Sequence, residues 1–305
     1  MPQSAFSSTS GWVILSEIEA RIKAKIEEAG TPLKDWDVQI NYGIKTGFNE
    51  AFIIDQKKRD ELVEKCPKAD EIIRPILRGK HIKQYVSKMH KEWIIIIPFG
   101  WTDANRGNSD PEDFIKQSFS VVYDHFIASS KIKFKGKGLF KRDDQGKYWW
   151  ELRACDYLEE FSKEKLIYID IMTDNDLEGY KFPAFSYARN EVFTLNTSYF
   201  MVGDEFNLKY ILGVLNSKLG KFIVKTNVTV LQKRQYRLFL QFVAEFKIPT
   251  ADKLIKDKII SFTNQIIEQR IIGHDTLNLE ALINQEIYNI CNFTDEESYF
   301  LNNQE

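Results

Sequence analysis

Residues 40–55 read INYGIKTGFNEAFIID, two apolar runs that enclose a short polar turn. Gly43 and Gly47 flank the centre of this turn, and glycine permits backbone angles that other residues resist. Such a pattern predicts a tight polar loop presented between two strands. The loop would present an ammonium, a hydroxyl and an amide, from Lys45, Thr46 and Asn49.

The composition of the 305-residue chain is that of a soluble globular protein, with 43% hydrophobic and 28% charged residues. This length accommodates one or two domains. No apolar run approaches the roughly 20 residues of a membrane-spanning helix, and the N-terminus lacks a basic-then-apolar leader, so we expect a cytoplasmic protein without a membrane partner. The cysteines lie far apart and form no CxxC motif, so neither a zinc site nor a disulfide framework is indicated.

The net charge of −2 conceals an uneven distribution of charge along the chain. Residues 65–91 hold eight Lys or Arg against two acidic residues, and residues 131–153 hold eight against three. Between Glu205 and Glu245 there are seven Lys or Arg and no acidic residue, whereas residues 274–305 contain seven acidic residues and no Lys or Arg. Because the chain contains separate basic segments, nucleic acid remains a candidate partner although the net charge is negative.

Apolar periodicity predicts a chain that mixes helices and strands as far as residue 249 and is helical after it. Isoleucines spaced four apart indicate a helix over 12–29, with Ser16 and Glu19 as a capping box. The β-branched run of 92–98 indicates a buried strand, and a long polar loop is expected over 99–110. Further helices are expected over 111–130, 208–224, 252–272 and 277–291, further strands over 165–172 and 182–199, and an exposed strand or loop over 131–137.

The ordered motifs of the chain resemble those of a known family. After the loop at 43–55, residues 74–85 read RPILRGKHIKQY. Residues 150–153 read WELR, and residues 210–218 read YILGVLNSK. Together with the TDEE ending at 294–297, these segments resemble the TaqI-like C-terminal specificity domain, which is the target-recognition region of type IIG restriction-modification enzymes and related adenine-N6 DNA methyltransferases.

The resemblance implies an α+β fold. A β-rich DNA target-recognition body with flanking helices would occupy residues 1–249, and residues 250–305 would form a helical segment that packs on it or acts as a spacer. The implied partners are double-stranded DNA, read sequence-specifically, and the methyltransferase domain of the same parent chain, in a bacterial or archaeal cytoplasm. The parent enzyme would use S-adenosylmethionine, and Mg²⁺ if it also cleaves DNA.

The motifs for that chemistry do not occur in this chain. An adenine-N6 methyltransferase needs an Asn/Asp-Pro-Pro-Tyr/Phe loop, and the sequence has no Pro-Pro pair. The Glu-x-Lys form at 245–247 lacks the upstream carboxylate of a metal-dependent nuclease, and the acidic stretch at 174–179 lacks the terminal Glu of a calcium loop. We therefore expect a C-terminal fragment with no catalytic residue, no metal ligand and no cofactor of its own.

Candidate DNA contacts are of two kinds, those that bind phosphates and those that bind base edges. Phosphates accept hydrogen bonds from Lys, Arg, hydroxyl and backbone N–H groups, whereas Arg or Lys match guanine and Asn or Gln match adenine. The residues selected on these grounds and for their place in polar loops are Lys45, Thr46, Asn49, Arg78, Lys80, Trp101, Asn105, Arg106, Lys133, Lys135, Lys137, Lys233, Arg234, Gln235 and Arg237.

Each selection competes with a structural role. The polar residues of the 43–49 loop would equally close a turn, Arg78 would equally form an internal ion pair, and the tryptophans at 149–150 are expected in the core. An alternative function is a protein-interaction or subunit-docking module of a restriction-modification or phage-defence complex, to which the acidic tail and the helix over 12–29 would contribute. DNA recognition requires the basic segments to converge on one concave surface that fits a duplex.

Overall fold

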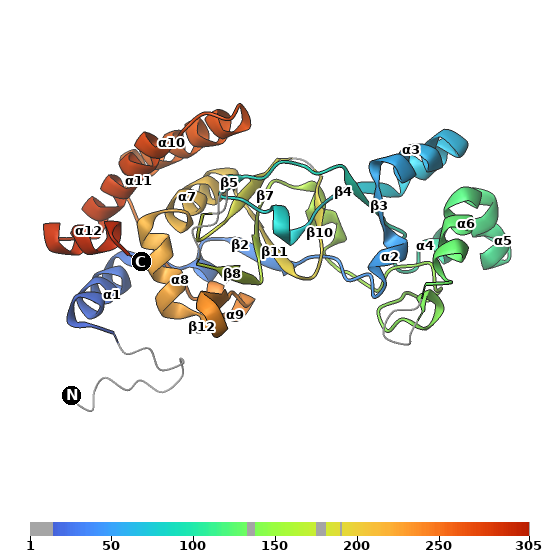
Figure 1. The fold of residues 1–305 in the computed structure, drawn as a ribbon, viewed down its shortest axis with the longest axis horizontal. Coiled ribbons are helices and arrows are strands. Elements are labelled where there is room, and N and C mark those ends of the chain that lie inside the picture. The colour runs from blue at the N-terminus through green and yellow to red at the C-terminus, as the bar shows by residue number, and fades with distance from the viewer. Residues whose placement is uncertain (1–14, 133–137, 175–180, 190, 305) are drawn as a thin grey trace.

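The computed structural model describes residues 15–132, 138–174, 181–189 and 191–304. Lys133, Lys135 and Lys137 lie outside the described residues. Two main sheets form the middle of the molecule, and helices gather at both ends of it (Figure 1). The predicted α+β fold class is confirmed.

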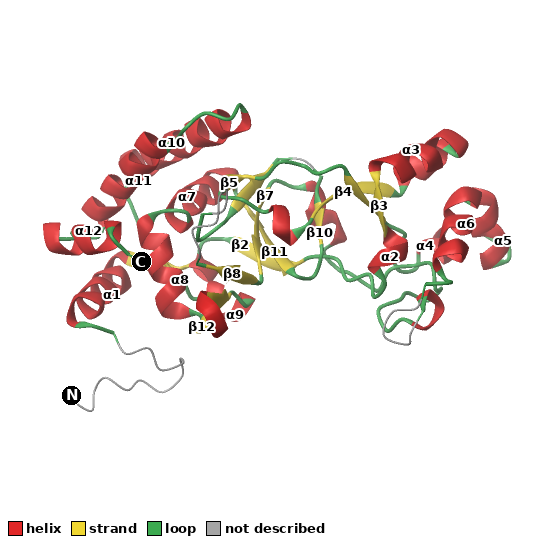
Figure 2. Ribbon diagram, viewed as in Figure 1, coloured by secondary structure: helices red, strands yellow, loops and turns green. Residues whose placement is uncertain are grey.

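A five-stranded sheet with the order β2-β11-β7-β9-β5 lies at the centre (Figure 2). Strand β11 pairs antiparallel with both β2 and β7, so that residues 38–42 and 166–169 flank it. Strand β5 runs parallel to β9. The strands of this sheet are β2 (Val38–Tyr42), β5 (Tyr85–Val86), β7 (Lys165–Ile169), β9 (Ser186–Ala188) and β11 (Ser198–Gly203).

A four-stranded sheet with the order β10-β4-β6-β3 forms the second body, and two small sheets complete the fold. The second sheet consists of β3 (Ile53–Asp55), β4 (Ile73–Leu77), β6 (Glu92–Ile95) and β10 (Phe193–Thr194). The small sheets are β12-β13-β8, from β8 (Ile171–Thr173), β12 (Thr229–Val230) and β13 (Gln235–Arg237), and β1-β14, from β1 (Gly30–Pro32) and β14 (Lys247–Pro249).

The helices divide between the two ends of the molecule (Figure 1). One end holds α1 (Glu17–Ala29), α7 (Glu205–Leu215), α8 (Lys218–Asn227), α9 (Leu240–Val243), α10 (Lys253–Ile271), α11 (Leu277–Ile290) and α12 (Asp295–Asn302). The other end holds α2 (Asn49–Phe52), α3 (Gln56–Lys65), α4 (Trp101–Asn105), α5 (Pro111–Ser118) and α6 (Ser120–Ser129). Among the described residues, no helix is both long enough and apolar enough to cross a membrane.

The central sheet separates two hydrophobic cores. Because strand side chains alternate between faces, Leu166 and Tyr168 of β7 enter the core shared with α7, α10 and α11, while Ile167 enters the core of the second body. Helices after residue 249 thus share a core with α7, and the predicted boundary at that residue stays a prediction.

Local hydrogen bonds divide several predicted elements. The predicted helix over 208–224 is two helices, because Asn216 bonds the backbone of Phe185 through both amide atoms and Ser217 caps α8. The predicted helix over 111–130 breaks at Phe119, whose backbone is not helical. The predicted loop over 99–110 contains α4, and the predicted strands over 182–199 pair with other strands rather than with each other. Ser16 and Glu19 do form a capping box, so α1 begins at Glu17.

Candidate nucleic-acid interface

The glycine loop at 43–47 is held by close backbone contacts. A side chain at Gly43 would lie 2.3 Å from the carbonyl oxygens of Thr194 and Leu195, so only glycine fits there. Gly47 adopts a φ of +68°, the left-handed region that favours glycine. The predicted strand-loop-strand is here a strand, a loop and the short helix α2 leading into β3.

Thr46 closes this loop instead of facing solvent. Its hydroxyl donates to Asn49 Oδ1 at 2.6 Å and accepts from the backbone N–H of Phe48 at 3.2 Å, and the residue is 2% exposed. The structural alternative therefore holds for Thr46. Lys45, beside it, is 43% exposed and stays a predicted DNA contact.

Arg142 ties the glycine loop to the segment 139–151. Its Nε donates to the carbonyl oxygen of Thr46 at 2.8 Å, its other nitrogens donate to the carbonyls of Leu139, Trp149 and Glu151, and its guanidinium stacks on the ring of Phe52 at 4.7 Å. Burial lowers the pKa of Arg142 to about 10, so the side chain remains charged at neutral pH. This role of Arg142 was not predicted, because local sequence does not distinguish a buried arginine from an exposed one.

Glu151 explains the WELR segment. The carboxylate is fully buried and accepts hydrogen bonds from the backbone N–H groups of Thr102 at 3.0 Å and Gly100 at 3.3 Å, at the start of α4. Trp150 Nε1 donates to Thr102 Oγ1 at 3.0 Å, and Trp150 lies in the core as predicted. Trp150 and Glu151 therefore order the second body, whereas Arg153 at the end of the segment is exposed.

Three of the predicted contacts on α4 make intramolecular contacts. Trp101 packs on Phe114 and Phe119. Asn105 Nδ2 donates to the carbonyl of Trp101 at 2.7 Å. Arg106 pairs with Asp103 at 2.8 Å, and the hydrogen bonds that Asp103 accepts from Lys147, Arg106 and Tyr148 hold the pKa of its carboxyl well below the usual range.

The LRG turn after β4 combines one ion pair with one exposed cation. Arg78 lies 3.7 Å from Glu92, so the predicted internal ion pair exists, while Lys80 is exposed. A side chain at Gly79 would lie 3.1 Å from Ile169 and 3.4 Å from Ser198, which places this turn against the central sheet.

The basic segment around residue 234 lies close to acidic residues in the folded protein. Strand β8 lies beside β13, and the buried Asp174 at its end pairs with Lys225 at 2.8 Å, Arg234 at 2.9 Å and Lys221 at 3.3 Å. Although burial alone raises the pKa of Asp174, the bonds and charges of these cations lower it below the usual value.

Among the neighbouring predicted contacts, Arg237 is also paired with an acidic residue. Arg237 pairs with Asp170 at 3.3 Å and stacks on Phe239. Gln235 lies in β13 opposite Thr173. Lys233 belongs to a short 3₁₀ segment, Gln232–Arg234. Arg234 and Arg237 remain 56% and 39% exposed, so they combine structural pairing with access to solvent.

The turn between β10 and β11 is where distant segments meet. The backbone N–H of Asn196 donates to the carbonyl of Ile44 at 3.0 Å, and Asp170 N–H donates to the carbonyl of Thr197 at 3.0 Å. Gly79 approaches the same turn. Asn196 and Thr197 are exposed. Neither residue is among the predicted contacts, although an Asn in a short polar break between two strands was an available signal.

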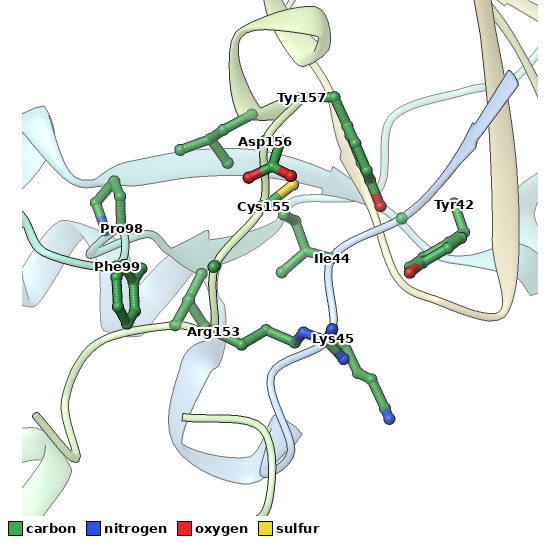
Figure 3. Close-up of a pocket in the computed structure, with 13 residues that line it drawn as sticks. Tyr42, Ile44, Lys45, Pro98, Phe99, Arg153, Cys155, Asp156 and Tyr157 are labelled. Atoms are coloured by element: carbon green, nitrogen blue, oxygen red, sulfur yellow. The ribbon is translucent and has the colours of Figure 1, made fainter. Parts of the chain in front are cut away.

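Lys45 and Arg153 line a cavity of about 310 Å³ (Figure 3). Ile44, whose carbonyl accepts from Asn196, also lines it. Both cations lie 3.2 Å from Asp144, which is 15% exposed, so two positive charges share one carboxylate. The glycine loop, the LRG turn and Asp170 thus contact the β10–β11 turn. The predicted concave surface for a duplex stays a prediction.

A model of the TaqI-like C-terminal specificity domain matches residues 74–248. The chain belongs to this family. The predicted resemblance is confirmed, and with it the prediction of a specificity domain of restriction-modification enzymes.

Relatives and solved structures agree with this family. The type II methyltransferase M.MjaIV of Methanocaldococcus jannaschii is 24% identical over 267 residues, which are 86% of this chain and 81% of the relative. The fold is similar to that of the type IIL restriction-modification enzyme MmeI, solved in complex with DNA, at a TM-score of 0.58 and 13% identity over 87% of this chain. It is also similar to the type IIG restriction endonuclease BpuSI, at a TM-score of 0.52 and 12% identity over 95% of this chain.

The chain spans only 36% of the MmeI chain and 34% of the BpuSI chain. At these identities the similarity concerns the fold of this specificity domain.

Proposed function

We propose that this specificity domain reads double-stranded DNA with the exposed β10–β11 turn and the basic residues around it. The observation that carries the proposal is the meeting of the glycine loop, the LRG turn and residue 170 at Asn196 and Thr197. An exposed asparagine matches the N6 and N7 edge of adenine, and exposed cations beside it suit phosphates. Lys45, Arg153 and Arg237 supply such cations.

The domain would supply specificity while the chemistry resides in the parent enzyme. We propose that a methyltransferase domain of the parent chain transfers a methyl group from S-adenosylmethionine to adenine N6, and that Mg²⁺ serves any cleavage. The membership of the family and the type II methyltransferase relative support this assignment. The fragment itself would hold no cofactor and catalyse nothing in the cytoplasm.

The apolar end of the helical segment supports contact with that methyltransferase domain. Ile271, Ile272 and Leu277, around the α10–α11 connection, are 57%, 66% and 57% exposed. Large exposed apolar patches mark protein contacts, and we infer that these neighbouring residues contribute to one. Replacement of Ile272 by Ser would weaken co-purification with the methyltransferase domain of the parent protein, whereas Leu254→Ser, at the other end of α10, would not.

A salt titration of duplex binding tests the DNA proposal. If about six phosphates are contacted, a plot of log affinity against log salt concentration has a slope of about −5. Each lost phosphate contact makes this slope less steep by about 0.9. The Lys45→Ala, Arg153→Ala double variant should therefore make the slope less steep by about 2. Lys253→Ala is the control, because Lys253 is 88% exposed on α10. Binding that is independent of salt would contradict the proposal.

A further inference from the structure

The cavity beside the glycine loop has the dimensions of a small-molecule site. Its volume of about 310 Å³ lies at the lower end of the roughly 300–1,000 Å³ found for ligand pockets. Residues 42–45, around the start of the glycine loop, form one part of the lining, and residues 152–158, from the end of the WELR motif onward, form another. Arg142 and the close approach at Gly43 fix these walls, so the cavity is preformed.

Aromatic side chains stand on two sides of the cavity. Figure 3 shows Phe99 on one side and Tyr42 with Tyr157 on the other. Phe99 is 56% exposed and Tyr42 is 45% exposed, and the rings of Tyr42 and Tyr157 meet edge to face at 6.0 Å. Large exposed aromatic groups that line a cavity offer stacking faces to a flat ligand.

The cavity is lined by two cations and by a carboxylate. Lys45 and Arg153 share the carboxylate of Asp144 at 3.2 Å each, so this cluster keeps one positive charge for an anion, which Asp156 offsets over the cavity as a whole. Asp156 lines the cavity as an exposed carboxylate, and a carboxylate accepts hydrogen bonds from an exocyclic amino group. Cation and carboxylate thus suit the phosphate and the base of one nucleotide.

We propose that this cavity receives a single nucleotide turned out of the duplex, with its base beside Phe99 and its phosphate at Lys45 and Arg153. The faces of paired bases are covered by their neighbours, so aromatic side chains that bind base faces require a base that has left the stack. Asp156 favours a base that carries an amino group, such as adenine or cytosine, over thymine. The proposal rests on the proposed function, because the duplex must lie across the glycine loop.

Binding of duplexes with one unpaired base tests the proposal without knowledge of the recognised sequence. Two duplexes are compared by fluorescence anisotropy, one fully paired and one with a single bulged adenine, because an unpaired base leaves the helix at little cost. The protein should bind the bulged duplex about tenfold more tightly, and a bulged thymine should give a smaller gain. Phe99→Ala should abolish the preference and leave affinity for the paired duplex nearly unchanged.

The controls separate the cavity from the wider DNA proposal. Phe206→Ala is the matched control, because Phe206 is 63% exposed on α7 and does not line the cavity. Equal urea midpoints would show that both variants are folded. Equal binding of paired and bulged duplexes by the wild-type protein, or a preference that survives Phe99→Ala, would overturn the cavity assignment and leave the proposed function intact. Failure to bind either duplex would overturn both.

Discussion

Arg142 donates its Nε proton to the carbonyl oxygen of Thr46 at 2.8 Å and thereby joins two segments that lie 96 residues apart in the sequence. The remaining guanidinium N–H groups bond the carbonyls of the 139–151 segment. One buried cation therefore fixes both the glycine loop and the wall of the neighbouring cavity.

Replacement of Arg142 by Met should lower the free energy of unfolding by about 3 kcal/mol, because several buried carbonyl groups lose their donor. Urea denaturation measures the change. Arg153→Met is the control, since Arg153 is 46% exposed and surface changes stay within about 0.5 kcal/mol. Equal effects of the two substitutions would contradict the assigned role of Arg142.

Asn196→Ala should reduce discrimination at one base position by about 1–3 kcal/mol, because we propose that its amide reads a base edge. The salt slope should stay the same, because an uncharged side chain neutralises no phosphate. Selection from a randomised duplex library, followed by titration of the selected sites, measures both quantities. Asn303→Ala, an exposed change at the end of α12, should leave the selected sequence unaltered. A uniform loss of affinity over all sequences would assign Asn196 to the phosphates instead.

Stability should fall as the pH decreases from 7.5 to 5.5. Burial lowers the pKa of His125 below 6.5 in the folded protein, although the hydrogen bond between Nε2 and the carbonyl of Ala51 opposes this. Because the unfolded chain then binds more protons than the folded one, acidification favours unfolding below about pH 6.5. His125→Gln should flatten the dependence of the urea midpoint on pH. His274→Gln, at an exposed position, should not flatten it.

Asp174→Asn should destabilise the fold by about 3 kcal/mol, because the buried carboxylate that balances Lys221, Lys225 and Arg234 is lost. Raised salt should recover part of this loss by screening the repulsion between the cations. Thermal or urea unfolding at low and high salt measures both effects. Asp257→Asn, which removes the exposed pair with Lys253, should change stability little.

Local sequence patterns predicted the helices, strands and loops better than the distant residues that these elements contact. The apolar run around residue 94, the capping box of Ser16 and the glycine loop are encoded by neighbouring residues, and the structure contains all three. The break at Asn216 depends on the backbone of Phe185, which lies 31 residues away, and periodicity within one helix does not contain that contact.

The candidate site shows the same limit more sharply. The stretch between Glu205 and Glu245 has no acidic residue in sequence, yet Asp170 and Asp174, which flank the neighbouring strand β8, form ion pairs with it. Sequence reasoning therefore overstated the charge of this region. It also selected Thr46, which is buried, and passed over Asn196, whose exposure depends on how two sheets meet.

The β10–β11 turn connects one strand of each main sheet, with β10 beside β4 and β11 between β2 and β7. Leu195 and Ser198 are buried in this connection, while the two residues between them face outward. If the turn reads DNA as proposed, substitutions at those two positions would exchange one DNA target for another during evolution without disturbing either hydrophobic interior. The scaffold would then acquire a new target while its folding is left unchanged.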